Sequence, residues 1–286
     1  MEPILRRNLV MFTSFISFIA ISALFGCEND VNTGTICKNN PELCSDLHKD
    51  SWCRYEKADL IKKRYTLKHT PSPTGQQLYR HLINLENYSK CIELAAGVQH
   101  ILHPERTNDR IRAYGLSAQS LAQLQETTKD STDLYLAYYH WTRFNDEKAQ
   151  AVVLNAEKKQ QVNDIELLAS IASYYQKFDA KKAQQVYLHV FDLSNEDNFN
   201  PDWLLGLANT YQKTNDLELT YLLSRANVLM TEHKVSEQKM LRLIKNDEAI
   251  KSVLDDQAED LVDELNSGDF KTSSFRLMFM RDKSAL

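Results

Sequence analysis

Three stretches of residues 133–229 share one order: a helix-forming run, a short polar break, and a second helix-forming run. They read DLYLAYYHWTRFNDEKAQAVVLNAEKK, ELLASIASYYQKFDAKKAQQVYLHVFDL and WLLGLANTYQKTNDLELTYLLSRANVL. Small residues recur at corresponding points of the two runs, at spacings of 34 to 37 residues: Ala137, Ala172 and Ala208 in the first run, and Ala149, Ala183 and Thr220 in the second. We expect three antiparallel helix hairpins, each of which buries its apolar face only by stacking on the next.

The region of residues 133–229 resembles the tetratricopeptide family, whose small, aromatic and alanine positions are partly matched in the third stretch by Leu204, Leu207, Ala208, Tyr211 and Leu217. It departs from the family at Thr220 and Ser224, where alanine and a large aromatic residue are usual. The resemblance covers about a third of the chain and implies an all-α fold with hairpins stacked as a tetratricopeptide-like solenoid. The alternative is an ordinary all-helical bundle.

The rest of the chain is also expected to be helical, because only 7 Gly and 6 Pro leave few turn-forming residues. Pro71 and Pro73 predict a loop over residues 66–75. An amphipathic run covers residues 109–125, and the segment NLENYSKCIELAAGV is a candidate second helix of another repeat. His100 and His103 are three residues apart before Pro104, a pattern that favours capping or surface roles over metal binding.

A long amphipathic helix is expected near the C-terminus, with its first turn at Asn246 and its end at Gly268. One face carries an acidic ridge: Asp255, Asp256, Glu259, Asp260, Asp263 and Glu264. Like charges at i,i+4 repel by about 0.2–0.5 kcal/mol per pair. The ridge is either a binding surface for a basic partner or a solvated face, and the solvated face is favoured. The final SSFRLMFM is expected to dock on the body of the protein.

The N-terminus has the layout of a bacterial export signal. Arg6 and Arg7 precede an apolar stretch over residues 9–25, and Leu24-Phe25-Gly26-Cys27 lie at its end. These four residues resemble the lipobox of bacterial lipoproteins, and the resemblance implies cleavage before Cys27 and a lipid on its thiol. An uncleaved signal anchor and simple secretion are the alternatives, because the apolar stretch borders on the roughly 17–25 residues of a membrane span.

The other four cysteines, Cys37, Cys44, Cys53 and Cys91, form an even set, which in an exported chain predicts disulfides. No pair shows zinc-ligand spacing. Four cysteines allow three connectivities. We favour Cys37–Cys44, which would close the turn CKNNPELC, and Cys53–Cys91, which would hold the N-terminal segment on a helix.

The order lipobox, ICKNNPELC, SWCR and YSKCIEL followed by helices resembles a family of lipoproteins from Gram-negative bacteria that is known only as a domain of unknown function. The resemblance implies exposure to the periplasm and no particular biochemistry. We expect five segments: a signal peptide (1–26), a tether (27–36), a disulfide-stapled segment (37–75), a helical-repeat domain (76–232), and a C-terminal helical region and tail (233–286). Glu28 leaves the choice of membrane open, and we favour the outer membrane.

Removal of Arg6, Arg7 and Glu2 with the signal peptide changes 34 basic and 39 acidic residues to 32 and 38, a net charge of −6. A mildly acidic chain without a basic cluster argues against nucleic-acid binding. No GxSxG, phosphate-binding or dinucleotide-binding motif is present, so we expect no catalytic residue, cofactor or metal. The sequence favours a membrane-anchored, periplasm-facing protein that binds a protein or peptide. The alternatives are a cell-envelope enzyme, a regulator of a wall enzyme, and a small-ligand capture protein.

Overall fold

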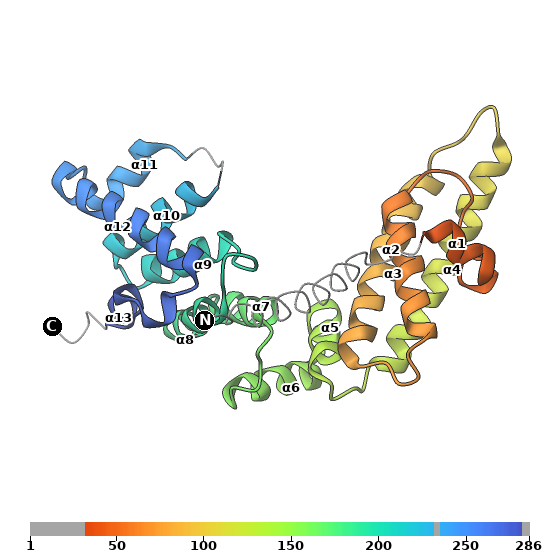
Figure 1. The fold of residues 1–286 in the computed structure, drawn as a ribbon, viewed down its shortest axis with the longest axis horizontal. Helices are drawn as coiled ribbons and strands as arrows, with labels where there is room; N and C mark the ends of the chain where they lie inside the picture. The colour runs from red at the N-terminus through yellow and green to blue at the C-terminus, as the bar shows by residue number, and fades with distance from the viewer. Residues whose placement is uncertain (1–31, 232–234, 282–286) are drawn as a thin grey trace, which may run out of the picture. The chain divides into compact units, whose positions relative to one another are not determined.

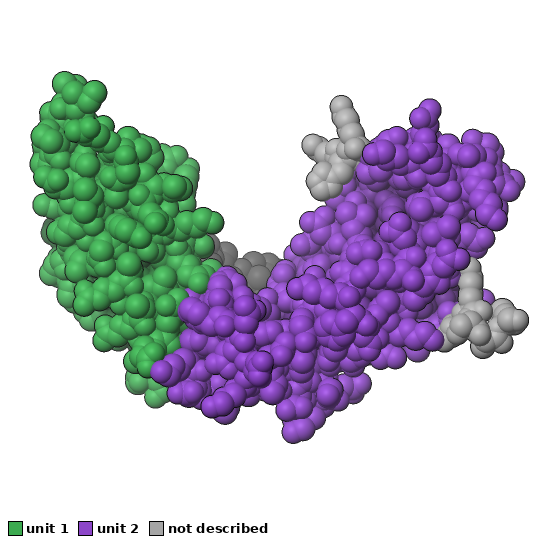
Figure 2. All heavy atoms as spheres, turned by 180° about the vertical axis from the view of Figure 1, so that it is seen from behind, with its two compact units in different colours: residues 1–128 green, residues 129–286 purple. Residues whose placement is uncertain are grey.

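A computed structural model describes residues 32–231 and 235–281 of the chain, and the regular elements within those ranges are all helices (Figure 1). The expected all-α fold is therefore confirmed. The chain divides into two compact units, residues 1–128 (unit 1) and residues 129–286 (unit 2), which Figure 2 colours separately. None of the helices in the described ranges combines the length and apolarity that a membrane span requires. The predicted signal peptide and Cys27 lie outside the described residues.

Unit 1 is built on three long helices preceded by a short helical segment. Its elements are α1 (Thr33–Asn39), η1 (Pro41–Leu43), α2 (Arg54–Lys68), α3 (Gly75–Ala96) and α4 (Pro104–Thr128). Helix α3 packs against both α2 and α4. The core between them is filled by Leu60, Ile61, Leu85, Tyr88, Ile92 and Ala113, and Ile36 of α1 packs into the same cluster.

Three boundaries in unit 1 differ from the sequence expectations. Helix α1 begins at Thr33, inside the expected tether (27–36), because the Asn32 side chain accepts a hydrogen bond from the Gly34 amide and caps it. Helix α2 extends to Lys68, three residues into the expected loop (66–75), since a proline restricts only the residue directly before it. Helix α4 begins at Pro104, because proline is accepted in the first turn of a helix.

Helix α3 starts at a capping box. The Thr74 hydroxyl accepts from the Gln77 amide, and the Gln77 side chain accepts from the Thr74 amide. The segment NLENYSKCIELAAGV forms the C-terminal part of this 22-residue helix and ends two residues beyond it. It packs against α2 and α4 within unit 1.

Unit 2 contains the three hairpins expected from the sequence. They are α5 (Leu134–Phe144) with α6 (Glu147–Lys158), α7 (Ile165–Tyr175) with α8 (Ala180–Leu193), and α9 (Asp202–Lys213) with α10 (Leu217–Met230). The second helix of each hairpin begins with an aspartate whose side chain accepts from backbone amides of the first turn: Asp146, Asp179 and Asp216. Each polar break therefore ends one helix and caps the next, which sets the repeat.

The small residues that define the repeat lie where the two helices of a hairpin meet. All are buried, with exposed fractions of 5 % or less: Ala137, Ala149, Ala172, Ala183, Ala208 and Thr220. Thr220, which departs from the tetratricopeptide pattern, is accommodated because its hydroxyl donates to the Asp216 carbonyl at 2.7 Å. A larger side chain at these points would hold the helices apart.

The C-terminal helices complete unit 2. They are α11 (Glu237–Leu241), η2 (Arg242–Ile244), α12 (Glu248–Ser267), η3 (Phe270–Thr272) and α13 (Ser274–Met280). Helix α12 packs against α10, and its stripe of Leu254, Ala258, Leu261 and Leu265 is buried. Its cap is Asp247 rather than the expected Asn246, which adopts a positive φ of 59°. Gly268 ends the helix as predicted, with φ at 77°.

The final helix α13 docks on the body of unit 2, as the sequence suggested. Phe270 contacts Phe191 of α8, and the Tyr211 hydroxyl of α9 donates to the Phe279 carbonyl. The Arg276 guanidinium forms a two-point ion pair with Asp192 of α8 at 2.6 and 2.8 Å. These contacts tie the end of the chain to the second and third hairpins.

The expected segment boundaries do not coincide with the units. The expected boundary between residues 75 and 76 falls inside unit 1, because α3 and α4 pack with the disulfide-stapled segment. The expected boundary at 232 and 233 falls inside unit 2, since α12 covers α10. Periodicity along a chain shows which residues share a helix face, but it does not show which helix that face meets.

Candidate functional site

The four cysteines of unit 1 form two disulfides. Cys37 is joined to Cys44, and Cys53 is joined to Cys91. This is the pairing that the sequence analysis favours. The first closes the turn between α1 and η1, and the second joins the start of α2 to the middle of α3. Their role is structural: they fix the segment before α2 on the helical bundle.

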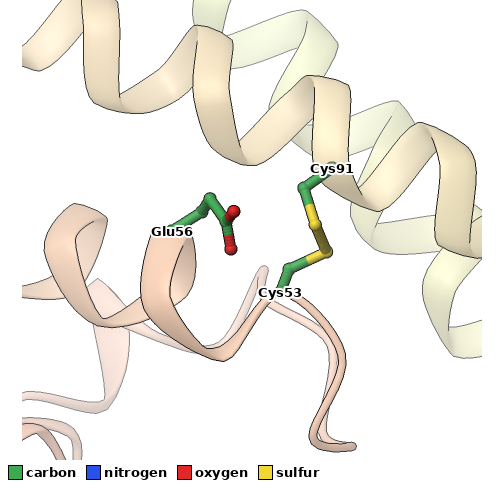
Figure 3. A group of neighbouring side chains, drawn as sticks. All are labelled: Cys53, Glu56 and Cys91. Carbon is green, nitrogen blue, oxygen red and sulfur yellow. A yellow bond between two sulfur atoms is a disulfide. The ribbon is translucent and has the colours of Figure 1, made fainter. Parts of the chain in front are cut away.

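Figure 3 shows the surroundings of the second disulfide, where the Glu56 carboxylate points toward the sulfur atoms of Cys53 and Cys91. The three side chains have ligand atoms within 4.8 Å of one another, a spacing that would suit a metal ion. A cysteine binds a metal ion as its thiolate, however, and both sulfur atoms are committed to the disulfide. The oxidised group offers a single carboxylate, and we assign it no metal.

A buried polar centre lies next to this disulfide. The His48 ring contacts the Tyr88 hydroxyl through Nδ1 at 2.9 Å and the Trp52 carbonyl through Nε2 at 2.6 Å. The Arg110 guanidinium, only 2 % exposed, is held by the Asp50 carboxylate at 2.6 and 2.7 Å. These contacts join the segment before α2 to α3 and α4 across 40 to 60 residues of sequence.

Ionisation in this centre follows from burial and pairing. Burial lowers the pKa of His48, and the neighbouring Lys57 lowers it further. Burial raises the pKa of Tyr88 to about 12. Burial opposes ionisation of Asp50, but the hydrogen bond and charge of Arg110 hold the pKa of that carboxyl below its ordinary value. At neutral pH the centre is thus a neutral His–Tyr pair beside a carboxylate–guanidinium pair, an arrangement suited to holding the segment in place.

The two spaced histidines do not share a helix face, because residues 97–103 form the turn between α3 and α4. His100 and His103 lie in that turn, where the Nδ1 atom of His100 accepts from the His103 amide at 3.1 Å. This is a local capping role, as the sequence suggested. His140, in α5, is buried, and its ring stacks on Phe144.

The acidic ridge on α12 divides into two parts. Asp255 is partly buried and is used inside unit 2: it accepts from the Tyr221 hydroxyl at 2.9 Å and from Lys251 at 2.8 Å. Burial opposes its ionisation, but these two donors and Arg225 lower the pKa of Asp255. The i,i+4 pair with Lys251 is readable in the sequence and could have separated Asp255 from the ridge. The exposed members are Asp256, Glu259, Asp260 and Asp263, and Glu264 is half-buried.

The first helices of the three hairpins, α5, α7 and α9, are neighbours. The Trp141 ring of α5 meets the Tyr174 ring of α7 edge-on at 4.8 Å between centroids. Gln176, at the end of α7, donates from its side chain to the Gly206 carbonyl of α9 at 2.8 Å. The first helices therefore form one layer of the stack.

This layer carries a repeated set of side chains. The residues directly after the buried alanines of the first helices occupy one repeat position: Tyr138, Ser173 and Asn209. A second repeat position lies four residues later and is occupied by Thr142, Lys177 and Lys213. All except the half-buried Tyr138 are exposed. We call these six residues the first-helix face. Hydroxyl, amide and ammonium groups in two rows can hydrogen-bond to the backbone or carboxylates of a peptide.

Apolar contact area lies at the turns that border this face. Phe144 is the last residue of α5 and Phe178 lies in the turn after α7, and they are 53 % and 63 % exposed. Phe178 packs edge-on against the Tyr174 ring at 4.9 Å between centroids, which fixes its position. Exposed aromatic side chains of this kind are enriched at protein-binding surfaces.

Stacked helical hairpins joined to a disulfide-stapled helical bundle define an all-α protein of the helical-repeat type. Residues 24–225 match the family described as "Protein of unknown function (DUF2989)". The chain therefore belongs to this family, and the matched range runs from three residues before Cys27 into α10. The comparisons with curated proteins and with solved structures gave no match.

Proposed function

We propose that this chain is an exported lipoprotein that binds a protein or peptide through the first-helix face of unit 2. The observation that carries the binding proposal is the repeat of exposed polar side chains on three neighbouring helices, bordered by Phe144 and Phe178. Stacked hairpins present such side chains at regular intervals, as an extended partner requires. The acidic residues Asp256, Glu259, Asp260 and Asp263 offer a second contact for a basic part of the same partner.

The anchor proposal rests on the sequence before the described residues. Cys27 follows an apolar stretch and precedes helix α1 by a short segment. One acyl chain binds a membrane reversibly, and several hold a protein permanently. We place the protein at the periplasmic face of a membrane, with the inner leaflet of the outer membrane favoured. The disulfides of unit 1 agree with an oxidising compartment.

The binding surface is tested by photo-crosslinking in cells. A photoreactive amino acid placed at Ser173 or at Asn209 should give an adduct of one defined mass with a protein partner. The matched control is Asn155, an exposed residue of α6, the second helix of its hairpin. Adducts of the same mass at all three positions, or none at Ser173 and Asn209, would contradict the proposal.

The anchor is tested separately by metabolic labelling with palmitate. The natural chain should incorporate label and partition with membranes, and the Cys27→Ala variant should not incorporate it. Cys37→Ala is the control, because that sulfur is committed to a disulfide in unit 1. Labelling that persists in Cys27→Ala would refute a lipid on this residue.

The alternative functions receive less support from the described residues. A cavity beside α13, lined by Leu188, Tyr211 and Phe279 among others, has a volume of about 260 Å³. Binding sites for small molecules are usually about 300–1,000 Å³. This cavity falls below that range, and two further hollows in unit 1, of about 510 and 330 Å³, are lined largely by charged side chains, so the first-helix face is the stronger candidate.

A further inference from the structure

The turn between α3 and α4, with the end of α3, exposes several large apolar side chains. Ile101 and Leu102 are 88 % and 82 % exposed, and Leu94 and Val98 are 71 % and 45 % exposed. We call these four residues the α3–α4 tip. Figure 1 shows this turn, in yellow, at one end of unit 1. Soluble surfaces expose single apolar residues routinely, but a contiguous set marks a binding surface.

Two backbone amides of this turn are hydrogen-bonded within unit 1. The His100 amide donates to the Thr107 hydroxyl of α4 at 2.9 Å, and the His103 amide donates to the His100 ring at 3.1 Å. The backbone is thereby fixed on both sides of Ile101 and Leu102. Residues 94–104, LAAGVQHILHP, contain no Asp, Glu, Lys or Arg. Transfer of these residues from water into a bilayer would therefore not require the dehydration of a permanently charged side chain.

Trp52 extends the apolar surface. The Cys53–Cys91 disulfide holds the residues beside Trp52 against α3, one turn before Leu94. The Arg110 guanidinium lies 5.0 Å from the centroid of the Trp52 ring and donates to the Val98 carbonyl at 3.4 Å. Trp52 remains 44 % exposed. The buried polar centre and the disulfide thus set a tryptophan beside the aliphatic tip.

We propose that the α3–α4 tip enters the interface of a phospholipid bilayer, a role that rests on the proposed lipid anchor for its membrane. A projecting turn has no groove to receive a peptide, but it can insert. Side chains inserted into an interface reach about 5–10 Å into the boundary between headgroups and acyl chains. Tryptophan is the side chain enriched at that depth. The aliphatic residues at the apex of the turn would enter the acyl-chain boundary, and Trp52 beside them would lie at the interface.

Chain length supports a bilayer as the occupant. Cys27 precedes Thr33, the first residue of α1, by six residues, which span at most about 20 Å. Helix α4, with 25 residues, is about 37 Å long. The anchor therefore keeps unit 1 close to the membrane surface, at a distance shorter than the length of α4. At this distance a weak affinity of the tip for the bilayer is sufficient, because the anchored chain inserts its tip in an intramolecular step.

The test uses a chain of residues 28–286, which retains every described residue and both disulfides but lacks Cys27. Flotation with neutral phosphatidylcholine vesicles at millimolar lipid measures the partition coefficient. The natural sequence should float with the vesicles, and Ile101→Ser with Leu102→Ser should lower the partition coefficient about tenfold or more. Circular dichroism confirms that both chains are folded.

The matched control is Leu277→Ser with Met280→Ser, which removes two apolar side chains of α13 that are 64 % and 58 % exposed. It should leave the partition coefficient unchanged. A second readout is a Leu102→Trp variant, whose fluorescence should fall with brominated lipids more than that of Leu277→Trp.

A natural chain that stays in the aqueous phase overturns the proposal, as does equal flotation of the Ile101 and Leu102 double variant. Equal loss in the α13 control, which would indicate nonspecific adsorption, also overturns it. These outcomes leave the anchor proposal standing, because the tested chain has no Cys27. Loss of palmitate labelling in the Cys27→Ala variant is measured independently of the tip.

Discussion

The second and third hairpins approach each other closely at Gly206. It lies inside α9, and a Cβ atom there would overlap the phenol of Tyr187 on α8. Glycine in a helix interior costs about 1 kcal/mol relative to alanine. The close approach of the Tyr187 ring offsets that cost through packing.

We therefore expect Gly206→Ala to destabilise unit 2, although alanine is the better helix former. Overpacking costs about 1–3 kcal/mol, which outweighs the gain of about 1 kcal/mol in helix propensity. Urea unfolding should show the loss. The double variant Gly206→Ala with Tyr187→Phe should remain destabilised, because the ring of residue 187 still overlaps the new Cβ atom. The double variant Gly206→Ala with Tyr187→Leu removes the ring and should relieve the overlap. Equal stability of natural protein and Gly206→Ala would contradict the packing argument.

His81 of α3 gives unit 1 a dependence on pH. Its Nδ1 atom is buried and has no hydrogen-bond partner among the described residues. Burial, together with the charges of Arg64 and Lys63, lowers the pKa of His81 to about 4. The unfolded chain binds this proton near pH 6.5. Stability from this group is therefore complete above about pH 6.5 and is lost as the pH falls toward 4.

The expected loss across that range is up to about 3 kcal/mol. His81→Gln should reduce the difference in unfolding free energy between pH 7 and pH 4.5, because glutamine binds no proton. The exposed His69 supplies the control, and His69→Gln should retain the natural pH dependence. An unchanged pH dependence in His81→Gln would show that other groups cause it.

At the scale of elements, the charge pattern of α12 opposes its own helix. Asp260 lies four residues from Asp256 and Glu264 and three from Asp263, so it faces three like charges. Each such pair costs about 0.2–0.5 kcal/mol. The helix forms because its opposite face is buried against α10, with Ala258 and Leu261 fully covered.

Asp260→Asn should accordingly raise the unfolding free energy by about 0.5–1 kcal/mol at low salt, and less at high salt. Thermal unfolding followed by circular dichroism measures the gain. If the exposed ridge contacts the partner, the same variant should weaken the adducts formed at Ser173 and Asn209. Asp255→Asn should instead destabilise unit 2, because Tyr221 and Lys251 lose a charged acceptor.

Much of this organisation was predictable at the level of elements. The three hairpins, the cap residue Gly268 and the docking of the last helix follow from local spacing and from apolar stripes. The polar centre of His48, Asp50, Tyr88 and Arg110 was not predictable, because its hydrogen-bonded pairs are 40 and 60 residues apart in sequence and share no pattern. The first-helix face and the α3–α4 tip also required a structure, since exposure is a property of the packed chain.

At the scale of the whole molecule, both disulfides lie in one unit. Cys37–Cys44 and Cys53–Cys91 belong to unit 1, and unit 2 contains no cysteine. In the loop-entropy account, a closed loop of 38 residues contributes about 4 kcal/mol and one of 7 residues about 2 kcal/mol. The stability of unit 1 therefore depends on oxidation, and that of unit 2 does not.

Reduction should lower the unfolding temperature of unit 1 alone, so that one transition moves and the other stays. Differential scanning calorimetry with and without a thiol reductant measures this. Cys53→Ser with Cys91→Ser should have the larger effect, and Cys37→Ser with Cys44→Ser the smaller. A chain of residues 129–286 should keep its own transition in either condition. In the whole chain, a shift of the unit 2 transition on reduction would show that the units do not unfold independently.

The sequence by itself determined the all-α class, the three hairpins and the even set of cysteines, because helix periodicity, small-residue spacing and capping aspartates are local properties of the chain. Only the tertiary structure decided that α3 and α4 belong with the disulfide-stapled segment, that Asp255 is an internal partner, and that Ile101 and Leu102 project into solvent. These features depend on which surfaces meet, and contacts between distant residues leave no periodic trace in one sequence.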